Sequence, residues 1–299
     1  MSKLYTLALI FILISCDSRR IVSNDDTIFV DYDKEQIFDW NNTILIKSVV
    51  SLETADDCVL SYARKCLVSG KYIVYHDEKQ KAIFVFDEEG TFLYVIDAVG
   101  GGPDEYTEIK DMAISCDKGF ILVLDNNSVV SFDLKNGRFQ DRISLPQDIA
   151  SNFYRFANVD KQTFYFWSTE KENSLYLYEN GEMKVIEKRT GFPFVCQKFY
   201  YDSENSLNYI SDYGLFEIHG LEQERVRKKY SFDFGYLNFS KSQMPKNVTE
   251  FEQVDDDESF KCIMSAFETD DDLFIMTVSP DGMLYNICLD KITHEVRAG

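Results

Sequence analysis

Short runs of alternating apolar and polar residues extend along the chain from Thr27 to Asp290. The apolar positions are rich in β-branched and aromatic side chains, and Gly, Asn, Asp or Ser bounds each run. Alternation directs every second side chain to the same face of a strand, so each run predicts a strand with one buried face. Clean helical periodicity is scarce. The pattern therefore predicts an all-β protein.

A strand–turn–strand phrase repeats within this pattern. Its turn glycines are predicted at Gly90, Gly137, Gly181 and Gly220, about 45 residues apart. Glycine adopts a positive φ without strain, as a tight hairpin requires. Two more strands precede each phrase, which gives four strands per unit. A repeat of this length and strand number is typical of the blades of a β-propeller.

The repeat predicts one β-propeller domain over residues 27–299. Strands within residues 27–52 are expected to belong to a closing blade. The few residues after Asp290 cannot supply the rest of a sixth blade of about 40 residues. We therefore expect either a shortened ring of the six-bladed type, with an incomplete closing blade, or a five-bladed ring with an irregular seam. The expected blades lie near residues 62–97, 110–144, 152–188, 195–232 and 259–299.

The first residues have the form of a signal peptide. Lys3 supplies a positive charge, and residues 4–14 form an apolar stretch. At about 1.5 Å per residue this stretch is too short to cross a bilayer core of roughly 30 Å as a helix. Leu13-Ile14-Ser15-Cys16 ends the stretch and resembles the bacterial lipobox. The resemblance implies a signal peptide over residues 1–15, acylation of Cys16, and a polar tether over residues 16–26.

The charge balance restricts the kinds of partner. The chain has 31 Lys and Arg against 51 Asp and Glu, a formal net charge of -20. Nucleic acids are bound mainly by Lys and Arg that neutralise phosphates, so nucleic acid is disfavoured as a partner. The expected contacts are a membrane, reached through the N-terminal lipid, and a glycan, peptide or protein ligand.

Residues 100–106 carry the clearest resemblance to a known family. Their sequence Gly-Gly-Gly-Pro-Asp-Glu-Tyr resembles the G-x-G-P-G-E-Y/F motif of the six-bladed β-propeller lipoproteins of gut Gram-negative bacteria, with Asp104 where the family usually has Gly. Residues 267–274 and 284–291 are similar to that family's penultimate blade. The resemblance implies an exported protein, anchored by lipid in the cell envelope, with the outer membrane as its expected location. It implies no catalytic mechanism.

The same glycine-rich loop is the candidate ligand-binding site, with Gly102, Asp104, Glu105 and Tyr106 as the candidate residues. Glycines let a ligand approach the backbone closely, and the carboxylates here and at Glu108 could bind a cation or a sugar. The alternative is a connector between blades, in which the glycines meet backbone demands and Tyr106 packs against a neighbour. A phosphate-binding Lys-Ser/Thr pair is missing from this loop.

The cysteines and histidines predict no metal site. Cys58 and Cys66 are the only locally plausible disulfide pair, and no CxxC spacing is present. Three cysteines fall in apolar runs and are predicted to be buried free thiols. Ligands from His76, His219 and His294 would not converge, because they occupy unlike positions in their blades. The three cysteines predicted to be buried are Cys116, Cys262 and Cys288.

The sequence also contains no catalytic signature: G-x-S-x-G and H-E-x-x-H are both absent. Several strand aromatics could stack on sugars, although packing between blades is the commoner role of such residues. We predict a binding or scaffolding module without catalytic residues, metal or cofactor. The alternative is a carbohydrate-active hydrolase or lyase with carboxylates in the central channel. The aromatics in question are Trp167, Tyr176, Tyr178, Tyr200 and Tyr201.

Overall fold

A computed structural model describes residues 27–33, 45–253 and 259–299. The predicted signal peptide, the lipidation residue Cys16 and the tether lie outside the described residues. Within the described ranges, no helix is long and apolar enough to span a bilayer.

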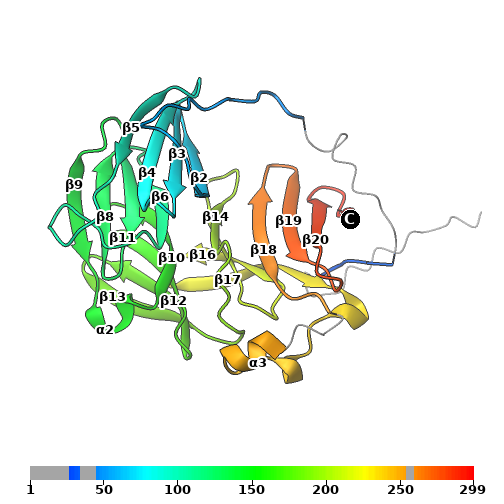
Figure 1. The fold of residues 1–299 in the computed structure, drawn as a ribbon. Coiled ribbons are helices and arrows are strands. Elements are labelled where there is room, and N and C mark those ends of the chain that lie inside the picture. Colours follow the sequence, from blue (N-terminus) through cyan, green and yellow to red (C-terminus); the bar gives the residue numbers. More distant parts are fainter. Residues whose placement is uncertain (1–26, 34–44, 254–258) are drawn as a thin grey trace, which may run out of the picture.

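The first three blades are antiparallel sheets of four sequential strands each (Figure 1). The first blade contains β2 (Ala63–Ser69), β3 (Tyr72–Asp77), β4 (Ala82–Asp87) and β5 (Phe92–Ile96). The second contains β6 (Asp111–Ile114), β7 (Phe120–Leu124), β8 (Ser128–Asp133) and β9 (Phe139–Ser144). The third contains β10 (Phe153–Asp160), β11 (Thr163–Ser168), β12 (Asn173–Glu179) and β13 (Glu182–Lys188).

Two more sheets complete the described part of the ring. The fourth blade contains β14 (Phe199–Tyr201), β15 (Leu207–Ile210), β16 (Glu217–Glu222) and β17 (Arg225–Asp233), and the fifth contains β18 (Ile263–Glu268), β19 (Asp272–Val278), β20 (Leu284–Asp290) and β21 (Val296–Ala298). β1 (Thr27–Phe29) is added in parallel to the outer edge of the fourth blade, beside β17. The short elements between blades are α2 (Gln147–Ala150), α3 (Val248–Gln253) and the 3-10 turns Gly235–Leu237 and Lys241–Gln243.

The innermost strands of successive blades lie next to one another. β2 neighbours β6, β6 neighbours β10, β10 neighbours β14, and β14 neighbours β18. This arrangement fans the sheets about a common axis and confirms the prediction of an all-β propeller with four-stranded blades (Figure 1).

The expected six-bladed type is wrong for the residues that the structure describes, which form five blades. In the described parts of this range, residues 27–33 and 45–52, the predicted closing blade does not form either. β1 joins the fourth blade instead, where Thr27 pairs with Ser231 and Phe29 with Asp233. Residues 45–50 are extended but belong to no sheet. A strand forms only where the edge of another strand is available for pairing. In the described structure β1 pairs with the free edge of β17.

The central strands are more apolar than simple alternation predicts. β4 and β11 are buried at nearly every position, so both of their faces are covered. The third blade packs against a blade on each side, which covers both faces of β11. In the first blade, the second blade covers one face of β4, and the chain around Leu52, Cys58 and Leu60 covers the other. Alternation therefore identified the strands, but it underestimated how much of each central strand is core.

Three of the four predicted turn glycines have the backbone conformation that the hairpins require. Gly90, Gly137 and Gly181 have φ of 87°, 68° and 92°. The fourth prediction is wrong, because Gly220 lies inside β16 and pairs with Asn208. The turn comes later, at Gln223, which has a φ of 55°. A polar residue in the left-handed region serves this turn in place of glycine.

A buried carboxylate fastens the fifth blade to the fourth. The side chain of Glu268 is almost completely buried. It accepts hydrogen bonds from the hydroxyls of Tyr200 (3.1 Å) and Tyr230 (3.0 Å) and from the ammonium of Lys229 (3.0 Å). Lys291 forms an ion pair with it at 3.0 Å. Charge-assisted bonds of this kind are about twice as strong as neutral ones, so the cluster ties the two sheets together.

The six cysteines in the described ranges are all free thiols. Cys262 and Cys288 are buried as predicted, and burial raises their pKa to about 12 and about 11. The prediction for Cys116 is wrong: it is exposed, because it stands in the turn after β6 instead of inside the strand. Cys58 and Cys66, the locally plausible disulfide pair, are separate free thiols: Cys58 is buried in the core and Cys66 is exposed at the surface.

These environments predict a clear pattern of thiol reactivity. Iodoacetamide added to the folded protein at pH 8 should label Cys66 and Cys116 and spare the buried thiols, because the thiolate is the reacting form and needs access. Peptide mass spectrometry after timed quenching gives the rate at each site. Labelling of Cys262 as fast as that of Cys66 would contradict the packing described here. Full labelling in denaturant is the control.

Candidate functional site

The glycine-rich loop predicted as a ligand site connects β5 to β6. The Glu105 carboxylate accepts a hydrogen bond from the backbone N–H of Gly102 at 2.7 Å, so these two candidates contact each other. Tyr106 is fully buried, and its hydroxyl lies 2.9 Å from the carbonyl oxygen of Lys81 and 3.1 Å from that of Ile96. Burial raises the pKa of this phenol far above its usual value.

Arg142 of the second blade holds the same loop. Its guanidinium donates to the carbonyl oxygens of Pro103 (3.1 Å) and Glu105. Asp104 is exposed, and Glu108 forms an ion pair with Lys110 at 3.8 Å. The contacts made by Glu105 and Tyr106 are those of a connector between blades. Ligand binding by Gly102, Asp104, Glu105 and Tyr106 stays a prediction.

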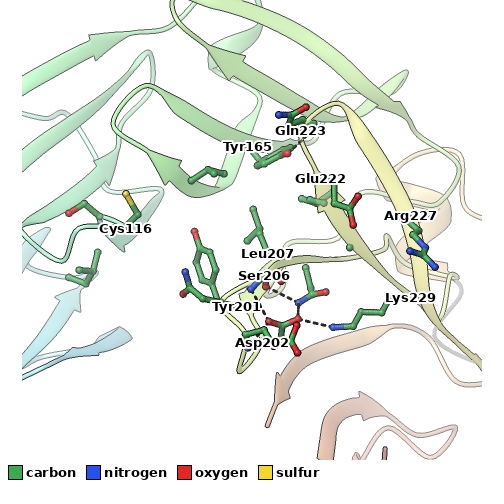
Figure 2. Close-up of a pocket in the computed structure, with 18 of the residues that line it drawn as sticks. Cys116, Tyr165, Tyr201, Asp202, Ser206, Leu207, Glu222, Gln223, Arg227 and Lys229 are labelled. Carbon is green, nitrogen blue, oxygen red and sulfur yellow. Dashed lines mark hydrogen bonds and ion pairs between the residues drawn. The ribbon is translucent and has the colours of Figure 1, made fainter. Parts of the chain in front are cut away.

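A cavity of about 740 Å³ lies elsewhere, where the C-terminal ends of four innermost strands meet (Figure 2). Val68 from β2, Ile114 from β6, Val159 from β10 and Tyr201 from β14 all line it. Turns of the second and fourth blades complete the wall. Because innermost strands surround the axis of a propeller, this hollow is one mouth of the central channel. We define it as the channel-mouth cavity; its wall further includes Cys116, Lys118, Tyr165, Asp202, Glu204, Asn205, Ser206, Glu222, Gln223, Arg227 and Lys229.

Two tyrosines form a fixed part of this wall. The hydroxyl of the buried Tyr165 donates to the carbonyl oxygen of Gln223 at 2.6 Å, and that of Tyr201 donates to the carbonyl oxygen of Asn158. Burial raises the pKa of each phenol to about 12, so both stay protonated at neutral pH. Tyr201 is nevertheless 41% exposed, which leaves part of its ring available to a ligand.

Asp202 shapes the floor of the cavity and is already fully engaged. Its carboxylate accepts bonds from the backbone N–H groups of Glu204 (3.1 Å) and Ser206 (2.8 Å) and from the ammonium of Lys229 (2.9 Å). Burial raises the pKa of this carboxyl, but these donors outweigh burial and hold the pKa below its usual value. Asp202 therefore stays ionised and orders its turn.

Other charged groups at the cavity are uncommitted. Lys118, Glu204, Glu222 and Arg227 make no side-chain hydrogen bond or ion pair with any other described residue. All four are exposed. A ligand in the cavity would thus meet free cations and free carboxylates together, such as Arg227 and Glu222 (Figure 2). The amides of Asn205 and Gln223 belong to the same wall.

Sequence reasoning found little of this cavity. From the sequence, Tyr201 is a candidate stacking residue and Cys116 a predicted core thiol, and no other lining residue is predicted to be functional. The lining residues come from one strand end per blade, about 45 residues apart, so no local motif joins them. The Asp202–Ser206 turn, which is polar and lies between two strands, was the one signal that could have indicated the region.

Of the other strand aromatics, three are buried and Tyr178 is partly buried. Trp167, Tyr176 and Tyr200 belong to the core between blades, which agrees with the packing alternative. Metal binding has no support from the described residues, because no group of three or more His, Cys, Asp or Glu is placed to hold an ion there. His76 is buried, His219 lies 3.3 Å from Glu217, and His294 is exposed in a turn.

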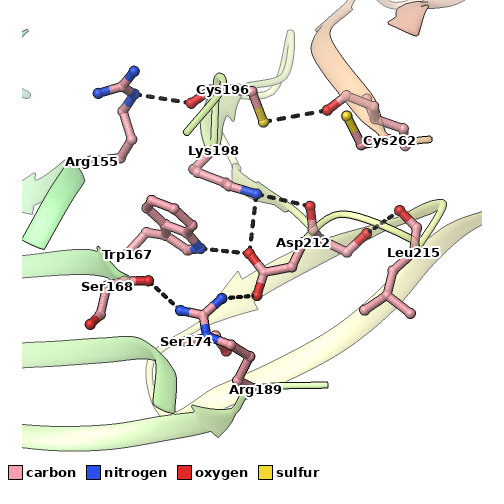
Figure 3. A network of polar contacts seen from close by, with 12 residues as sticks. Arg155, Trp167, Ser168, Ser174, Arg189, Cys196, Lys198, Asp212, Leu215 and Cys262 are labelled. Carbon is pink, nitrogen blue, oxygen red and sulfur yellow. Dashed lines mark hydrogen bonds and ion pairs between the residues drawn. The ribbon is translucent and has the colours of Figure 1, made fainter. Parts of the chain in front are cut away.

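A buried polar network occupies the opposite end of the third and fourth blades (Figure 3). Asp212 accepts hydrogen bonds from the indole N–H of Trp167 (2.8 Å) and the ammonium of Lys198 (3.2 Å), and it pairs with the guanidinium of Arg189. Both cations lie over the Trp167 ring, with Lys198 at 4.8 Å from its centroid. The network contains two cations, one carboxylate and little exposed surface, and it joins the two blades.

Comparison with known proteins places the fold in a family. The sequence profile of a domain of unknown function, DUF4934, matches residues 23–299. The chain belongs to the DUF4934 family. None of the curated proteins matches it. The description of this family names no activity, so membership alone does not identify the function of this DUF4934 chain.

Two solved structures share the fold of this DUF4934 chain. One is a protein of Bacteroides fragilis described as exported, with 16% identity and a TM-score of 0.72 over 92% of this chain and 79% of its own. The other is a DUF4221 member from Bacteroides vulgatus, with 13% identity and a TM-score of 0.53 over 83% of each chain. At these identities the similarity shows the fold alone.

Proposed function

We propose that this DUF4934 chain is a binding module that captures a peptide in the channel-mouth cavity. The observation that carries the proposal is the set of uncommitted charges of both signs around a hollow of about 740 Å³. Ligand sites combine a concave surface with a few free polar groups that fix orientation. The fixed tyrosines and the engaged Asp202 supply the rigid wall that such a site needs.

A peptide fits this set of groups because it carries both charges and a polar backbone. Arg227 and Lys118 can bind a carboxylate, and Glu204 and Glu222 can bind an ammonium or guanidinium group. The Gln223 and Asn205 amides can pair with peptide N–H and C=O groups. A neutral glycan is the second candidate, favoured by the exposed part of the Tyr201 ring.

The geometry favours binding over hydrolysis. Glycoside hydrolysis uses two carboxyl groups, one of which acts as an acid because its pKa is raised. Asp202, the carboxylate held most firmly in the cavity, has a lowered pKa and is bound by its own turn and by Lys229. Asp202 is therefore ionised at neutral pH and has no proton to donate as a general acid; its role is to hold the turn in the cavity wall.

We place this activity outside the cytoplasm, in a Gram-negative cell envelope. The apolar residues 4–14 and the lipobox-like Cys16 support export and lipid anchoring, with the outer membrane as the site. The fold neighbour from Bacteroides fragilis is described as exported, which supports the same location. An extracytoplasmic propeller of this kind would present its channel mouth to peptides in the envelope or outside the cell.

Binding measurements on the chain from Ser18 onward test the proposal. Fluorescence anisotropy with labelled hexapeptides that carry one Lys and one Glu should give saturable binding, and Arg227→Ala should weaken it about tenfold, since a hydrogen bond to a charged group contributes about 1.5–3 kcal/mol. Arg225→Ala is the matched control, because Arg225 lies on the same strand outside the cavity. Neutral oligosaccharides form the second arm. If Arg227→Ala leaves peptide binding unchanged, the channel-mouth cavity is not the peptide-binding site.

A further inference from the structure

Gly220 is a glycine in the middle of a strand whose backbone does not require one. It lies inside β16, pairs with Asn208 on β15 and with Arg227 on β17, and lines the channel-mouth cavity. It is not among the glycines with positive φ. Within 4 Å, a methyl group on its Cα would meet only the carbonyl oxygen of Arg227, at 3.9 Å. The fold therefore leaves room for a side chain that the sequence omits.

A bulge does not explain this glycine. Glycine weakens the interior of a strand, and where it occurs there it marks a bulge, a bend or a close approach of another backbone. The register shift beside Gly220 places its extra residue on the partner strand, because Ile218 pairs with Tyr230 and His219 with Lys228. Close approach of a ligand from the cavity is the role that remains for an absent side chain.

The neighbours of Gly220 turn the gap into a slot. Opposite residues of paired strands point to the same face, so Asn208 and Arg227 flank the glycine, about 5 Å away on either side. Asn208 is 1% exposed, and its amide NH2 donates to the backbone carbonyl oxygen of Ser206 (3.0 Å) and to the carboxylate of Asp202 (3.4 Å). Because both partners are acceptors, the amide oxygen points away from them. This oxygen accepts no hydrogen bond from any other described residue.

The charges beside the slot are of both signs. The guanidinium of Arg227 forms no ion pair with another described residue, and neither does the carboxylate of Glu222 (Figure 2). Glu222 lies two residues along β16 from the slot, on the same face and about 7 Å away. Lys229 also lines the cavity, but its ammonium is paired with Asp202 (2.9 Å) and Glu268 (3.0 Å). Arg227 is thus the cation available to a ligand in the slot.

We propose that the slot formed by Asn208, Gly220 and Arg227 binds the C-terminal residue of a peptide, so that the cavity selects peptides by their free C-terminal carboxylate. This inference rests on the proposed peptide binding and narrows it. The ligand's carboxylate accepts from the forked guanidinium, and its last backbone N–H donates to the amide oxygen of Asn208. Glu222 then favours Lys or Arg shortly before the last residue.

The close spacing of these groups favours a chain end over an acidic side chain. In a C-terminal residue only the Cα separates the carboxylate from the backbone N–H. One residue lying flat on Gly220 can therefore reach Asn208 and Arg227 together. A Glu side chain holds its carboxylate away from its own backbone on a flexible stem. Such a carboxylate could reach Arg227 from the open cavity and would not need a bare glycine beneath it.

A pair of hexapeptides with a free and an amidated C-terminus tests the proposal. Both are labelled at the N-terminus, carry one Glu and a Lys before the last residue, and are titrated by anisotropy against the chain from Ser18 onward. We expect the free acid to bind about tenfold more tightly, because the amide lacks the charge-assisted bond to Arg227. Equal binding of the two would overturn this inference and leave peptide binding in place. If neither binds, both proposals are wrong.

Gly220→Ala separates a role in binding from a role in folding. The methyl group fits the strand, so the melting temperature followed by circular dichroism should stay the same or rise. The same group occupies the slot, so the free acid should lose about tenfold in affinity and bind no better than the amide. A folded Gly220→Ala variant that still prefers the free acid would overturn the proposal.

Two substitutions on β17 complete the test. Arg227→Lys keeps the positive charge but loses the planar fork, so it should remove most of the preference for the free acid. Arg225→Ala, outside the cavity on the same strand, should keep that preference. If Arg227→Lys discriminates the two peptides as well as the wild type does, the slot does not bind the C-terminal carboxylate.

Discussion

Replacing Asp212 by asparagine is expected to lower the free energy of unfolding by about 3–5 kcal/mol, the range found when one partner is removed from a buried ion pair. Asp212 is the carboxylate between Lys198 and Arg189, and all three side chains are almost completely buried (Figure 3). Asparagine keeps the shape but removes the negative charge. Two cations then remain close together in a region that excludes water, and neither can be rehydrated without opening the interface between the third and fourth blades.

Urea denaturation followed by tryptophan fluorescence measures this effect, because Trp167 contacts the cluster directly. Glu78→Gln provides the control: it breaks the exposed pair of Glu78 with Arg64 and should cost less than about 1 kcal/mol. The triple variant Asp212→Leu, Lys198→Met, Arg189→Met should recover part of the loss, since apolar replacement of a whole buried ion cluster is often tolerated. If Asp212→Asn is as stable as Glu78→Gln, the cluster does not stabilise the interface between the third and fourth blades.

Asp77→Asn is expected to cost about 2 kcal/mol at pH 7, and the cost should disappear in acid. Asp77 is fully buried and accepts bonds from the backbone N–H groups of Ser61, Tyr62 and Gln80 and from the Gln80 side chain. Burial raises its pKa, but these donors outweigh burial and lower the pKa from 3.8 to about 2. A difference of that size corresponds to about 2 kcal/mol.

The sign of the pH effect follows from the direction of the shift. A carboxyl whose pKa is lower in the folded state stabilises the fold above its unfolded pKa, near 4, and loses that contribution as the pH falls toward about 2. Urea titrations at pH 7, 4 and 2.5 should therefore show the gap between the wild type and Asp77→Asn closing in acid. Glu88→Gln, an exposed change in the same blade, should show no such gap. If the difference in the free energy of unfolding between the wild type and Asp77→Asn does not change with pH, the loss of stability comes from the shape of the amide and not from the missing charge.

The propeller was predictable because its signals are local. A glycine at positive φ, such as Gly137, ends a strand and starts the next one within a few residues. The end of β16 was missed because Gln223 took the left-handed conformation that glycine usually provides. The pairing of β1 with β17 was missed for a different reason: the paired residues are about 200 positions apart, and many edges compete for a short strand.

The candidate site depends even more on distant contacts. Tyr165 and Gln223 belong to different blades, and only the arrangement of neighbouring blades about a common axis brings the hydroxyl to that carbonyl. The apolar neighbours of Cys116 predict burial, but the residue lies two positions past the end of β6, in a turn where its side chain is exposed. The glycine-rich loop stands out in the sequence because its motif is contiguous. Contiguous motifs are easily found in connectors between blades, whereas a cavity lined by residues from several blades has no contiguous motif.

The parallel pairing of β1 with β17 decides where the N-terminal part of the chain enters the fold. Thr27 is the first described residue after the expected lipid attachment at Cys16, and it pairs with Ser231 on the outer edge of the fourth blade. Tension between a membrane and the protein would thus act on the rim of the ring, far from the axis. If Cys16 carries a lipid, the ring would be held at its rim, and both ends of its central channel would stay accessible to diffusing molecules.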